Sequence, residues 1–142
     1  MRIKKLRANA IIPTYGSASA AGADLYACLE ADAVIEPGRT VFIPTGLAMA
    51  VPEGFAGLIY ARSSMGAKRG LAPANKVGVV DSDYRGEIRV VLLNHSKQPQ
   101  ILEPGERVAQ FVITPVLQPQ YELVEELTDT DRGAGGFGST GK

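Results

Sequence analysis

Short apolar runs separated by turn residues divide most of the chain into strand-sized pieces. These runs are rich in β-branched and aromatic residues, which favour β-strands, and they cover residues 34–35, 41–43, 55–60, 77–80, 88–93 and 108–116. Residues 87–90 alternate polar with apolar side chains, the pattern of a half-buried strand. The run then stays apolar to Leu93, as expected where both faces of a strand are covered. The pattern therefore predicts a mainly β protein.

A helical pattern is confined to residues 64–69, where a serine is available to cap the start and Gly70 to end the helix. Many short strands with regular turns are typical of an all-β sandwich or barrel, and we favour a jelly-roll-like topology with this one short helix. The chain changes character at Thr128, and five of its last ten residues are glycine. Such a segment cannot hold a fixed conformation unaided. We expect a β domain at residues 1–127 and a flexible tail at residues 128–142.

The composition narrows the range of partners. The 142 residues include 15 basic and 15 acidic side chains, so the formal net charge is zero. This balance argues against nucleic-acid or membrane binding through bulk charge, but not against one anionic ligand held by a few arginines. The single cysteine, Cys28, cannot form an internal disulfide, and no apolar run is long enough to cross a membrane. We expect a cytoplasmic protein with no nucleic-acid and no membrane partner.

The stretch from Asn75 to Glu87 joins two of the predicted strands. The apolar residues 77–80 end on Asp81-Ser82-Asp83, and the next apolar run begins at Ile88. Asp-Ser-Asp between two β-rich runs is favourable turn chemistry, so this stretch predicts a hairpin with a polar turn. Two carboxylates at a strand end are also candidates for acid–base chemistry. Taken alone the stretch favours a simple turn, and the rest of the chain decides between the two interpretations.

Three further polar groups are candidates for a site. The segment Arg62-Ser63-Ser64 lies at a strand-to-helix transition and suits phosphate binding, although a helix cap would also explain the serines. Asp24 lies among small and apolar residues, where a buried carboxylate needs a paired charge or an ion; the alternative is a position facing solvent at a strand edge. Arg107 and Gln110 begin an apolar strand. One histidine and one cysteine cannot build a usual zinc site, so a divalent ion would be oxygen-bound, with magnesium the best fit.

The C-terminal tail is a second candidate for phosphate binding. Its glycine-rich backbone would let several N–H groups converge on a phosphate, and Arg132, Ser139 and Thr140 add charge and hydroxyl donors. Phe137 has no core to join among these glycines and is suited to stacking on a base. Residues 136–142 also fit the first positions of a P-loop, but that motif needs a preceding strand and a following helix. The alternative is a flexible tail with an incidental phenylalanine.

Together these segments resemble the five ordered motifs of the trimeric deoxyuridine triphosphatases (dUTPases). The match runs through Ala-Gly-Ala-Asp-Leu at 21–25, Arg-Ser-Ser at 62–64, residues 75–86, Arg-Val-Ala-Gln at 107–110 and Arg-Gly-Ala-Gly-Gly-Phe-Gly-Ser-Thr-Gly at 132–141. The motifs follow the family's order and spacing over nearly the whole chain. One departure is Ala61, because the family usually has proline or glycine before the motif arginine; it does not change the expected function.

The resemblance implies a β jelly-roll homotrimer that hydrolyses dUTP to dUMP and pyrophosphate with Mg²⁺. Sites in that family lie between subunits, and the tail of one chain closes over a pocket built by two others. Asp81 then has the role of the general base that activates the attacking water, while Asp83 shapes the turn and influences Asp81 electrostatically. Asp24 would hold water molecules coordinated to magnesium rather than the ion itself.

The resemblance also assigns residues to each part of the nucleotide. Uracil binding falls to Asn75 and to the backbone of residues Gly78, Val79, Val80 and Asp81, with the backbone of Arg89 as a weaker candidate. Tyr84 would pack on the deoxyribose, where a ribose 2′-hydroxyl would clash. The other expected binding residues contact the phosphates or, for the phenylalanine, cover uracil: Arg62, Ser63, Ser64, Gln110, Arg132, Phe137, Gly138, Ser139 and Thr140.

Two alternative functions follow from the same pattern. A dCTP deaminase resembles the dUTPases in fold and oligomer, but deamination needs a glutamate that moves protons at the cytosine ring. The stretch at 81–86 and the phenylalanine-bearing tail match the triphosphatase instead. The second alternative is a jelly-roll module that binds a nucleotide or a protein without turnover, which the presence of every catalytic-type residue disfavours.

Overall fold

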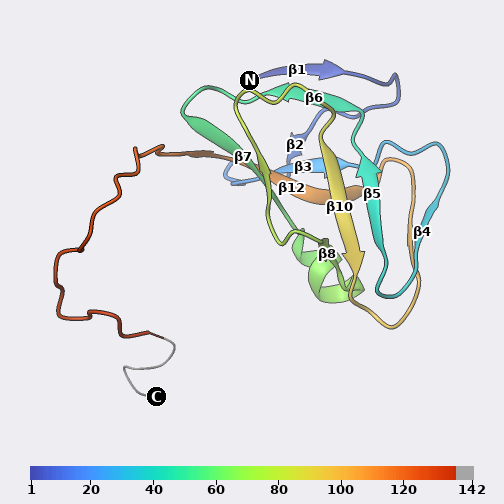
Figure 1. The fold of residues 1–142 in the computed structure, drawn as a ribbon. Coiled ribbons are helices and arrows are strands. Elements are labelled where there is room, and N and C mark those ends of the chain that lie inside the picture. Colours follow the sequence, from blue (N-terminus) through green and yellow to red (C-terminus); the bar gives the residue numbers. More distant parts are fainter. Residues whose placement is uncertain (137–142) are drawn as a thin grey trace.

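The computed structural model describes residues 1–136 and shows a β sandwich with an extended C-terminal arm (Figure 1). Its elements in chain order are β1 (Arg2–Lys5), β2 (Thr14–Tyr15), β3 (Ala23–Tyr26), β4 (Ala33–Ile35), β5 (Thr40–Pro44), β6 (Leu47–Ala50), β7 (Phe55–Tyr60), the helix η1 (Ser64–Lys68), β8 (Leu71–Pro73), β9 (Gly78–Val80), β10 (Arg89–Asn94), β11 (Gln100–Leu102) and β12 (Arg107–Pro115). Within residues 1–136 no helix has the length and apolar composition needed to cross a membrane.

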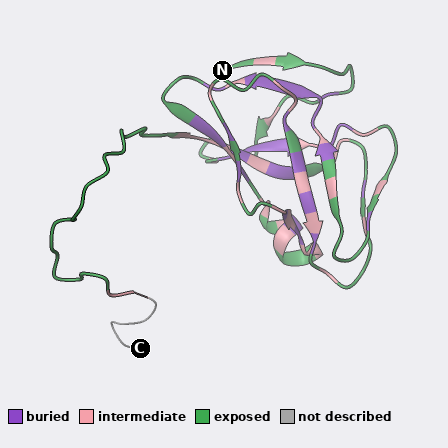
Figure 2. Cartoon of the chain, in the orientation of Figure 1, coloured by how far each residue is buried: buried purple, intermediate pink, exposed green. Residues whose placement is uncertain are grey.

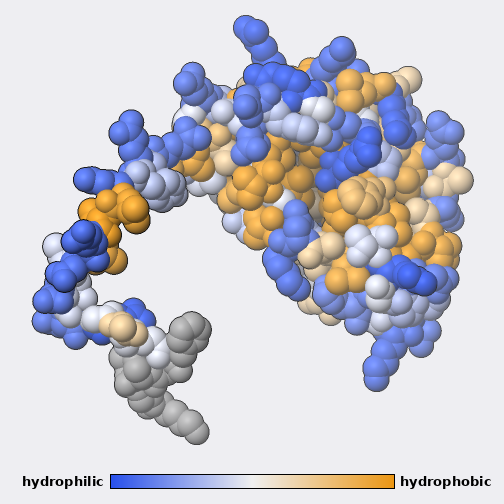
Figure 3. Space-filling model, viewed as in Figure 1, coloured by the Kyte–Doolittle hydropathy of each residue, from blue (hydrophilic) through white to orange (hydrophobic). Residues whose placement is uncertain are grey.

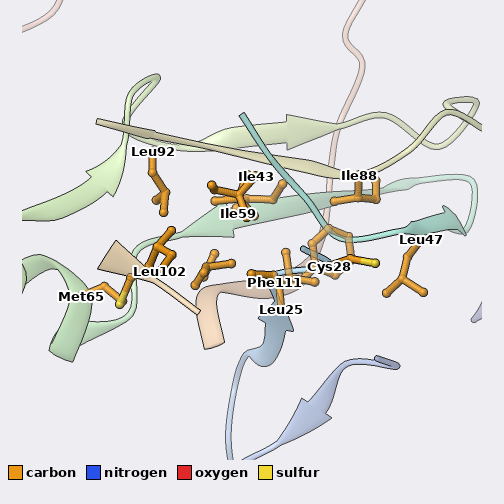
Figure 4. Close-up of a cluster of buried hydrophobic side chains, with 14 of the residues drawn as sticks. Leu25, Cys28, Ile43, Leu47, Ile59, Met65, Ile88, Leu92, Leu102 and Phe111 are labelled. Atoms are coloured by element: carbon orange, nitrogen blue, oxygen red, sulfur yellow. The ribbon is translucent and has the colours of Figure 1, made fainter. Parts of the chain in front are cut away.

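The strands form two larger and two smaller antiparallel sheets. One large sheet has the order β2-β3-β12-β7-β9 and the other has the order β5-β10-β8, while β1 pairs with β6 and β11 with β4. Apolar side chains from both large sheets join in one core, in which Phe111 and Leu25 lie with Ile43 and Leu92 (Figure 4). The expected all-β, jelly-roll-like architecture is confirmed.

All six apolar runs correspond to strands, namely β4, β5, β7, β9, β10 and β12. The pattern missed the other six strands, which are only two to four residues long. In β6 the residues Leu-Ala-Met-Ala have high helix propensity, and the strand exists because residues 47–50 pair in register with β1. In β3 the buried Asp24 interrupts the apolar pattern. Pairing with neighbouring strands, rather than local sequence, therefore defines these elements.

The short helix was found where it was expected, but its start differs from the prediction. It is a π-helix over Ser64–Lys68, and the residue at its N-cap position, Ser63, makes no side-chain capping hydrogen bond. The Ser64 hydroxyl instead accepts a hydrogen bond from Nη1 of Arg62 at 3.3 Å. The expected serine cap was therefore wrong. The stop is confirmed, because Gly70 has φ +66°, which favours glycine directly after a helix.

The expected hairpin between residues 77–80 and 88–93 was wrong. Strand β9 pairs with β7 in the five-stranded sheet, whereas β10 pairs with β5 and β8 in the other. Residues 81–88 therefore cross from one sheet to the other. The turn itself is present, since the Tyr84 N–H donates to the Asp81 carbonyl at 3.2 Å. Asp and Ser indicate that the chain turns, but they do not determine which strand pairs with which.

After β12 the chain leaves the sandwich as an exposed arm (Figures 1 and 2). Its large side chains include Leu117, Tyr121 and Leu123, which are 94%, 97% and 100% exposed. Figure 3 shows apolar groups on this arm, apart from the β body. The domain boundary at residue 127 stays a prediction.

Candidate functional site

A cleft of about 480 Å³ lies between β9, β10 and the crossing loop 81–88. Seven residues that the sequence pointed to line it: Asn75, Gly78, Val79, Val80, Asp81, Tyr84 and Arg89. Strand β9 is the edge of the five-stranded sheet, so one side of its backbone has no strand partner within residues 1–136. The cleft is therefore bordered by backbone donors and acceptors at fixed positions, an arrangement that suits a flat polar ligand.

Asn75 is held beside β9 by a tight turn. The Lys76 N–H donates to the Pro73 carbonyl at 2.9 Å, and Lys76 has the left-handed φ of 67°. A Cβ atom at Gly78 would lie 3.1 Å from Cβ of Ile59 and 3.5 Å from Nδ2 of Asn75. The absence of a side chain at Gly78 thus brings the Asn75 amide close to the strand backbone.

The crossing loop is organised around Tyr84. The Tyr84 hydroxyl donates to the Glu87 carbonyl at 3.1 Å, and Nη1 of Arg85 donates to the carbonyls of Ser82 and Tyr84 at 2.7 and 2.9 Å. A Cβ atom at Gly86 would lie only 2.3 Å from Oη of Tyr84. A glycine at position 86 is therefore needed for the tyrosine ring to fold back over the loop.

Asp81 lines two hollows, because it also borders a second one of about 770 Å³. That second hollow also contains Asp83 and Arg85, together with Phe55 from the start of β7. The Asp81 side chain is exposed. It is thus accessible to a water molecule and to a ligand seated next to β9.

Five residues of the first cleft were not predicted as site residues: Phe42, Ile59, Glu87, Ile88 and Val91. Phe42 lies on β5 opposite Val91 of β10, so only the strand pairing brings it to the cleft. The Glu87 side chain is 11% exposed, and its carboxylate accepts from the Gly46 N–H at 3.0 Å and from Nε of Arg89 at 3.0 Å. No sequence signal identified Phe42, whereas the position of Glu87 at the start of an alternating strand was a weak one.

A second group of expected site residues surrounds Asp24, which is 4% exposed. Its carboxylate accepts from Nε of Arg62 at 2.8 Å and from Nη1 of Arg107 at 3.3 Å. In the β3–β12 ladder Asp24 lies opposite Gln110, which in turn lies opposite Tyr60 of β7. Of the two possibilities left open by the sequence, the structure shows the buried and paired carboxylate rather than one facing solvent.

The Asp24 group can hold a metal ion only with help from a ligand. Both of its carboxylate oxygens accept hydrogen bonds from arginines, and the described residues contain no cluster of three or more His, Cys, Asp or Glu side chains that could hold an ion. Magnesium binds a few carboxylates together with waters and substrate phosphates. The donor set thus fits an ion that phosphates coordinate directly and that Asp24 contacts through water.

The Asp24 group and the cleft beside β9 lie apart within one chain. The strand order β3-β12-β7-β9 places three strand spacings between Asp24 and the cleft at Gly78, which corresponds to about 14 Å. Arg132 lies on the exposed arm, where its Nε donates to the Gly135 carbonyl at 2.9 Å. Residues Phe137, Gly138, Ser139 and Thr140, which the sequence singled out, lie outside the described residues.

Cys28 lies outside both groups. It is 2% exposed, and its thiol donates to Oδ1 of Asn9 at 3.0 Å. Burial raises the pKa of this thiol, so the neutral form is favoured and the residue is a poor nucleophile.

Comparison with known proteins identifies the family. The dUTPase family model matches residues 8–141. A deoxyuridine 5′-triphosphate nucleotidohydrolase from Syntrophotalea carbinolica is 43% identical over 141 residues, which cover 99% of this chain and 96% of the relative. Among solved structures, the dUTPase of Staphylococcus bacteriophage 80alpha with dUpNHpp has a TM-score of 0.87 at 28% identity, covering 99% of this chain and 98% of that one.

A dUTPase from phage phi11 of S. aureus, described with a coordinated structural Mg(II) ion, has a TM-score of 0.78 at 24% identity, covering 88% of this chain and 96% of that one. This likeness supports the fold. The order of the five motifs, the jelly-roll sandwich and the match of the family model agree with one another. The chain belongs to the dUTPase family.

Proposed function

We propose that the protein hydrolyses dUTP to dUMP and pyrophosphate. The observation that carries this proposal is the cleft in which the free edge of β9 lies beside Asp81 and Tyr84, in a chain of the dUTPase family. The test is to incubate the protein with dUTP or dCTP and to assay pyrophosphate and ammonia separately. Pyrophosphate from dUTP is expected. Ammonia from dCTP would indicate a deaminase, and nucleotide binding without either product would indicate a binding module.

Uracil is bound along the edge of β9, where backbone groups of residues 78–81 and the Asn75 amide pair with the polar edge of the base. Rigid backbone donors and acceptors discriminate well, because a base with the wrong edge leaves buried polar groups unpaired. Ile59 and Val91 contribute apolar walls to the same cleft. The narrow space beside β9 excludes the methyl group of thymine.

Tyr84 packs on the deoxyribose and blocks a 2′-hydroxyl. Its ring is held by the hydrogen bond to the Glu87 carbonyl, and Gly86 leaves the space that the ring occupies. A rigid aromatic wall can reject a ribose because it cannot move aside without losing these contacts.

Asp81 is the general base. It follows directly after β9, so a nucleotide whose base lies along that strand extends its phosphates toward the carboxylate. The carboxylate takes a proton from the water that attacks the α-phosphorus, and pyrophosphate leaves. Asp83 holds the turn and adds negative charge near Asp81. Little covalent chemistry is required of the protein, so positioning and electrostatics supply most of the rate.

The triphosphate is held by Arg62, Ser63, Ser64 and Gln110, with Arg132 and the tail residues Ser139 and Thr140 at the γ-phosphate. Mg²⁺ neutralises phosphate charge when it is bound, and Asp24 would hold it through its water ligands. The ion pairs of Asp24 with Arg62 and Arg107 orient both the carboxylate and the guanidinium of Arg62 toward this task.

The active unit is a homotrimer with shared sites. Two observations support this: the Asp24 group lies about 14 Å from the cleft within one chain, and the arm carries exposed apolar side chains such as Leu117, Tyr121 and Leu123. Burial of these side chains against another copy would remove apolar surface from water. Light scattering on the purified protein tests the oligomeric state, and a monomer would contradict the proposed trimer.

A cytoplasmic location fits a protein with a single cysteine, and cell fractionation tests this location.

A further inference from the structure

The side chain of Arg69 makes an unusually large number of hydrogen bonds for a partly exposed arginine. It follows η1 directly, and its side chain is 26% exposed. Nε donates to Oε1 of Gln100 at 3.1 Å, Nη1 donates to Oε1 of Glu106 and lies 3.7 Å from Sδ of Met65, and Nη2 donates to the Ile101 carbonyl. All three nitrogens of the guanidinium are thus engaged, and they join η1 to β11 and to the turn before β12.

The partner Glu106 is itself fixed. Its second carboxylate oxygen accepts from the Glu103 N–H at 3.2 Å, and its backbone carbonyl accepts from the Ala27 N–H at 2.8 Å. Ala27 follows β3, the strand that carries Asp24, and Glu106 precedes Arg107. Arg69 is therefore anchored to the β3–β12 frame that presents Asp24, Arg107 and Gln110.

Two charged bridges thus join the chain around η1 to the β3–β12 frame. The inner bridge runs from Arg62 through Asp24 to Arg107, and the outer bridge runs from Arg69 to Glu106. Arg62 and Arg69 flank η1 on its two sides, and Glu106 and Arg107 are consecutive residues. The two bridges thus connect the chain on both sides of η1 to the β3–β12 frame.

We propose that Arg69 is a positioning residue for the triphosphate. It holds the segment Arg62–Ser64 at a fixed separation from Gln110 on β12. This inference rests on the proposed function, because it assigns the task of a residue beside the proposed phosphate-binding segments. Arg69 touches no part of the nucleotide itself and acts through the geometry of η1.

The short helix needs such an anchor. One turn of helix is unfavourable alone, because several backbone torsions are fixed for few hydrogen bonds. Its start has no serine cap, and Met65 is its only buried residue. An arginine presents five donors in a rigid planar fork that spans separated acceptors, whereas a lysine offers one compact ammonium group. The position of the segment before η1 therefore depends on Arg69 more than on the helix.

The test compares Arg69→Ala, Arg69→Lys and Glu106→Gln with the unchanged protein. Affinities for dUMP, dUDP and dUpNHpp are measured by calorimetry, and kcat and KM are measured for dUTP. In the unchanged protein we expect affinity to rise as phosphates are added. In Arg69→Ala we expect this rise from dUMP to dUpNHpp to shrink by about tenfold, a change of roughly 1.4 kcal/mol. KM for dUTP should rise more than kcat falls.

The milder variants separate positioning from folding. In Glu106→Gln the rise in affinity from dUMP to dUpNHpp should shrink, but less than in Arg69→Ala. In Arg69→Lys this rise should be larger than in Arg69→Ala and smaller than in the unchanged protein. The matched control is Arg39→Ala, because Arg39 is an exposed arginine just before β5, and it should leave the whole series unchanged. If Arg69→Ala does not fold, Arg69→Lys and Glu106→Gln decide the question.

Two results in Arg69→Ala would overturn the assignment. One is a loss of affinity that is equal for dUMP and dUpNHpp. The other is a lower melting temperature with unchanged affinities for all three nucleotides, because Arg69 would then have a merely structural role. Failure of the unchanged protein to hydrolyse dUTP would count against the proposed function instead. The two failures are therefore distinguishable.

Discussion

At the scale of single residues, Asp81 is the group on which turnover should depend most. We predict that Asp81→Asn lowers kcat for dUTP by about 10²- to 10⁴-fold, because the amide cannot accept the proton of the attacking water. Folding and dUpNHpp affinity should change little, since the side chain is exposed and the amide has nearly the same shape. Steady-state kinetics and calorimetry measure both effects. A near-normal kcat would refute the role of Asp81 as the base.

Gly86 controls the place of Tyr84 and therefore the choice of sugar. A methyl group at position 86 would lie within 2.3 Å of Oη of Tyr84, so the ring must move. We predict that Gly86→Ala lowers the preference for dUTP over UTP by about tenfold, equivalent to roughly 1.4 kcal/mol. The ratio of kcat/KM for the two nucleotides measures it.

The control for this variant is Gly16→Ala, because a Cβ atom at Gly16 would have no neighbour within 4 Å. That substitution should leave the ratio unchanged. An unaltered ratio in Gly86→Ala as well would mean that Tyr84 does not exclude the ribose.

At the scale of the elements, the close approach of β7 and β12 depends on Gly57. The ring of Phe111 lies over this glycine, and an added Cβ would be 2.2 Å from Cζ of Phe111. Phe111 is 3% exposed and belongs to the core, so its ring has little room to move. We predict that Gly57→Ala destabilises the protein by about 1–3 kcal/mol through overpacking. Chemical denaturation measures this, and unchanged stability would show that the core can rearrange around the ring.

The elements also show how far the sequence was sufficient. Residues 55–60 were predicted as a strand with the bounds of β7, because the run is apolar, aromatic and bounded by turn residues. Strand β6 was missed because Leu, Ala and Met carry no β preference, and its pairing with β1 spans more than forty residues. The hairpin was wrong for the same reason: local turn chemistry is visible in the sequence, whereas the partner of β9 is fixed by contacts between distant segments.

The same distinction holds for the candidate site. Seven expected residues line one cleft because they lie within fifteen consecutive positions, from the turn before β9 to the start of β10. The pairing of Asp24 with both Arg62 and Arg107 could not be derived from spacing, because it depends on β3 and β12 being neighbours. Phe42 and Arg69 had no signal at all, since their importance comes from strand pairing and from contacts across the fold.

At the scale of the whole molecule, assembly and closure of the site should depend on different parts of the C-terminal segment. The exposed apolar side chains Leu117, Tyr121, Leu123 and Leu127 all precede residue 128, whereas Arg132 and the glycine-rich motif follow it. A chain that ends at Thr130 should therefore still form a trimer. Its kcat/KM for dUTP should fall by about 10- to 100-fold, because losing one charged hydrogen-bond partner costs about 1.5–3 kcal/mol.

Light scattering and steady-state kinetics on the same sample measure both effects, and a chain that lacks only Lys142 is the control. Full activity of the chain ending at Thr130 would show that the tail takes no part in hydrolysis. Loss of the trimer in that chain would place assembly contacts in residues 131–142 rather than in the apolar arm. A trimer with low activity would assign association to the arm and phosphate contact to the tail, because removal of a side chain that binds only the γ-phosphate leaves the apolar contacts between subunits intact.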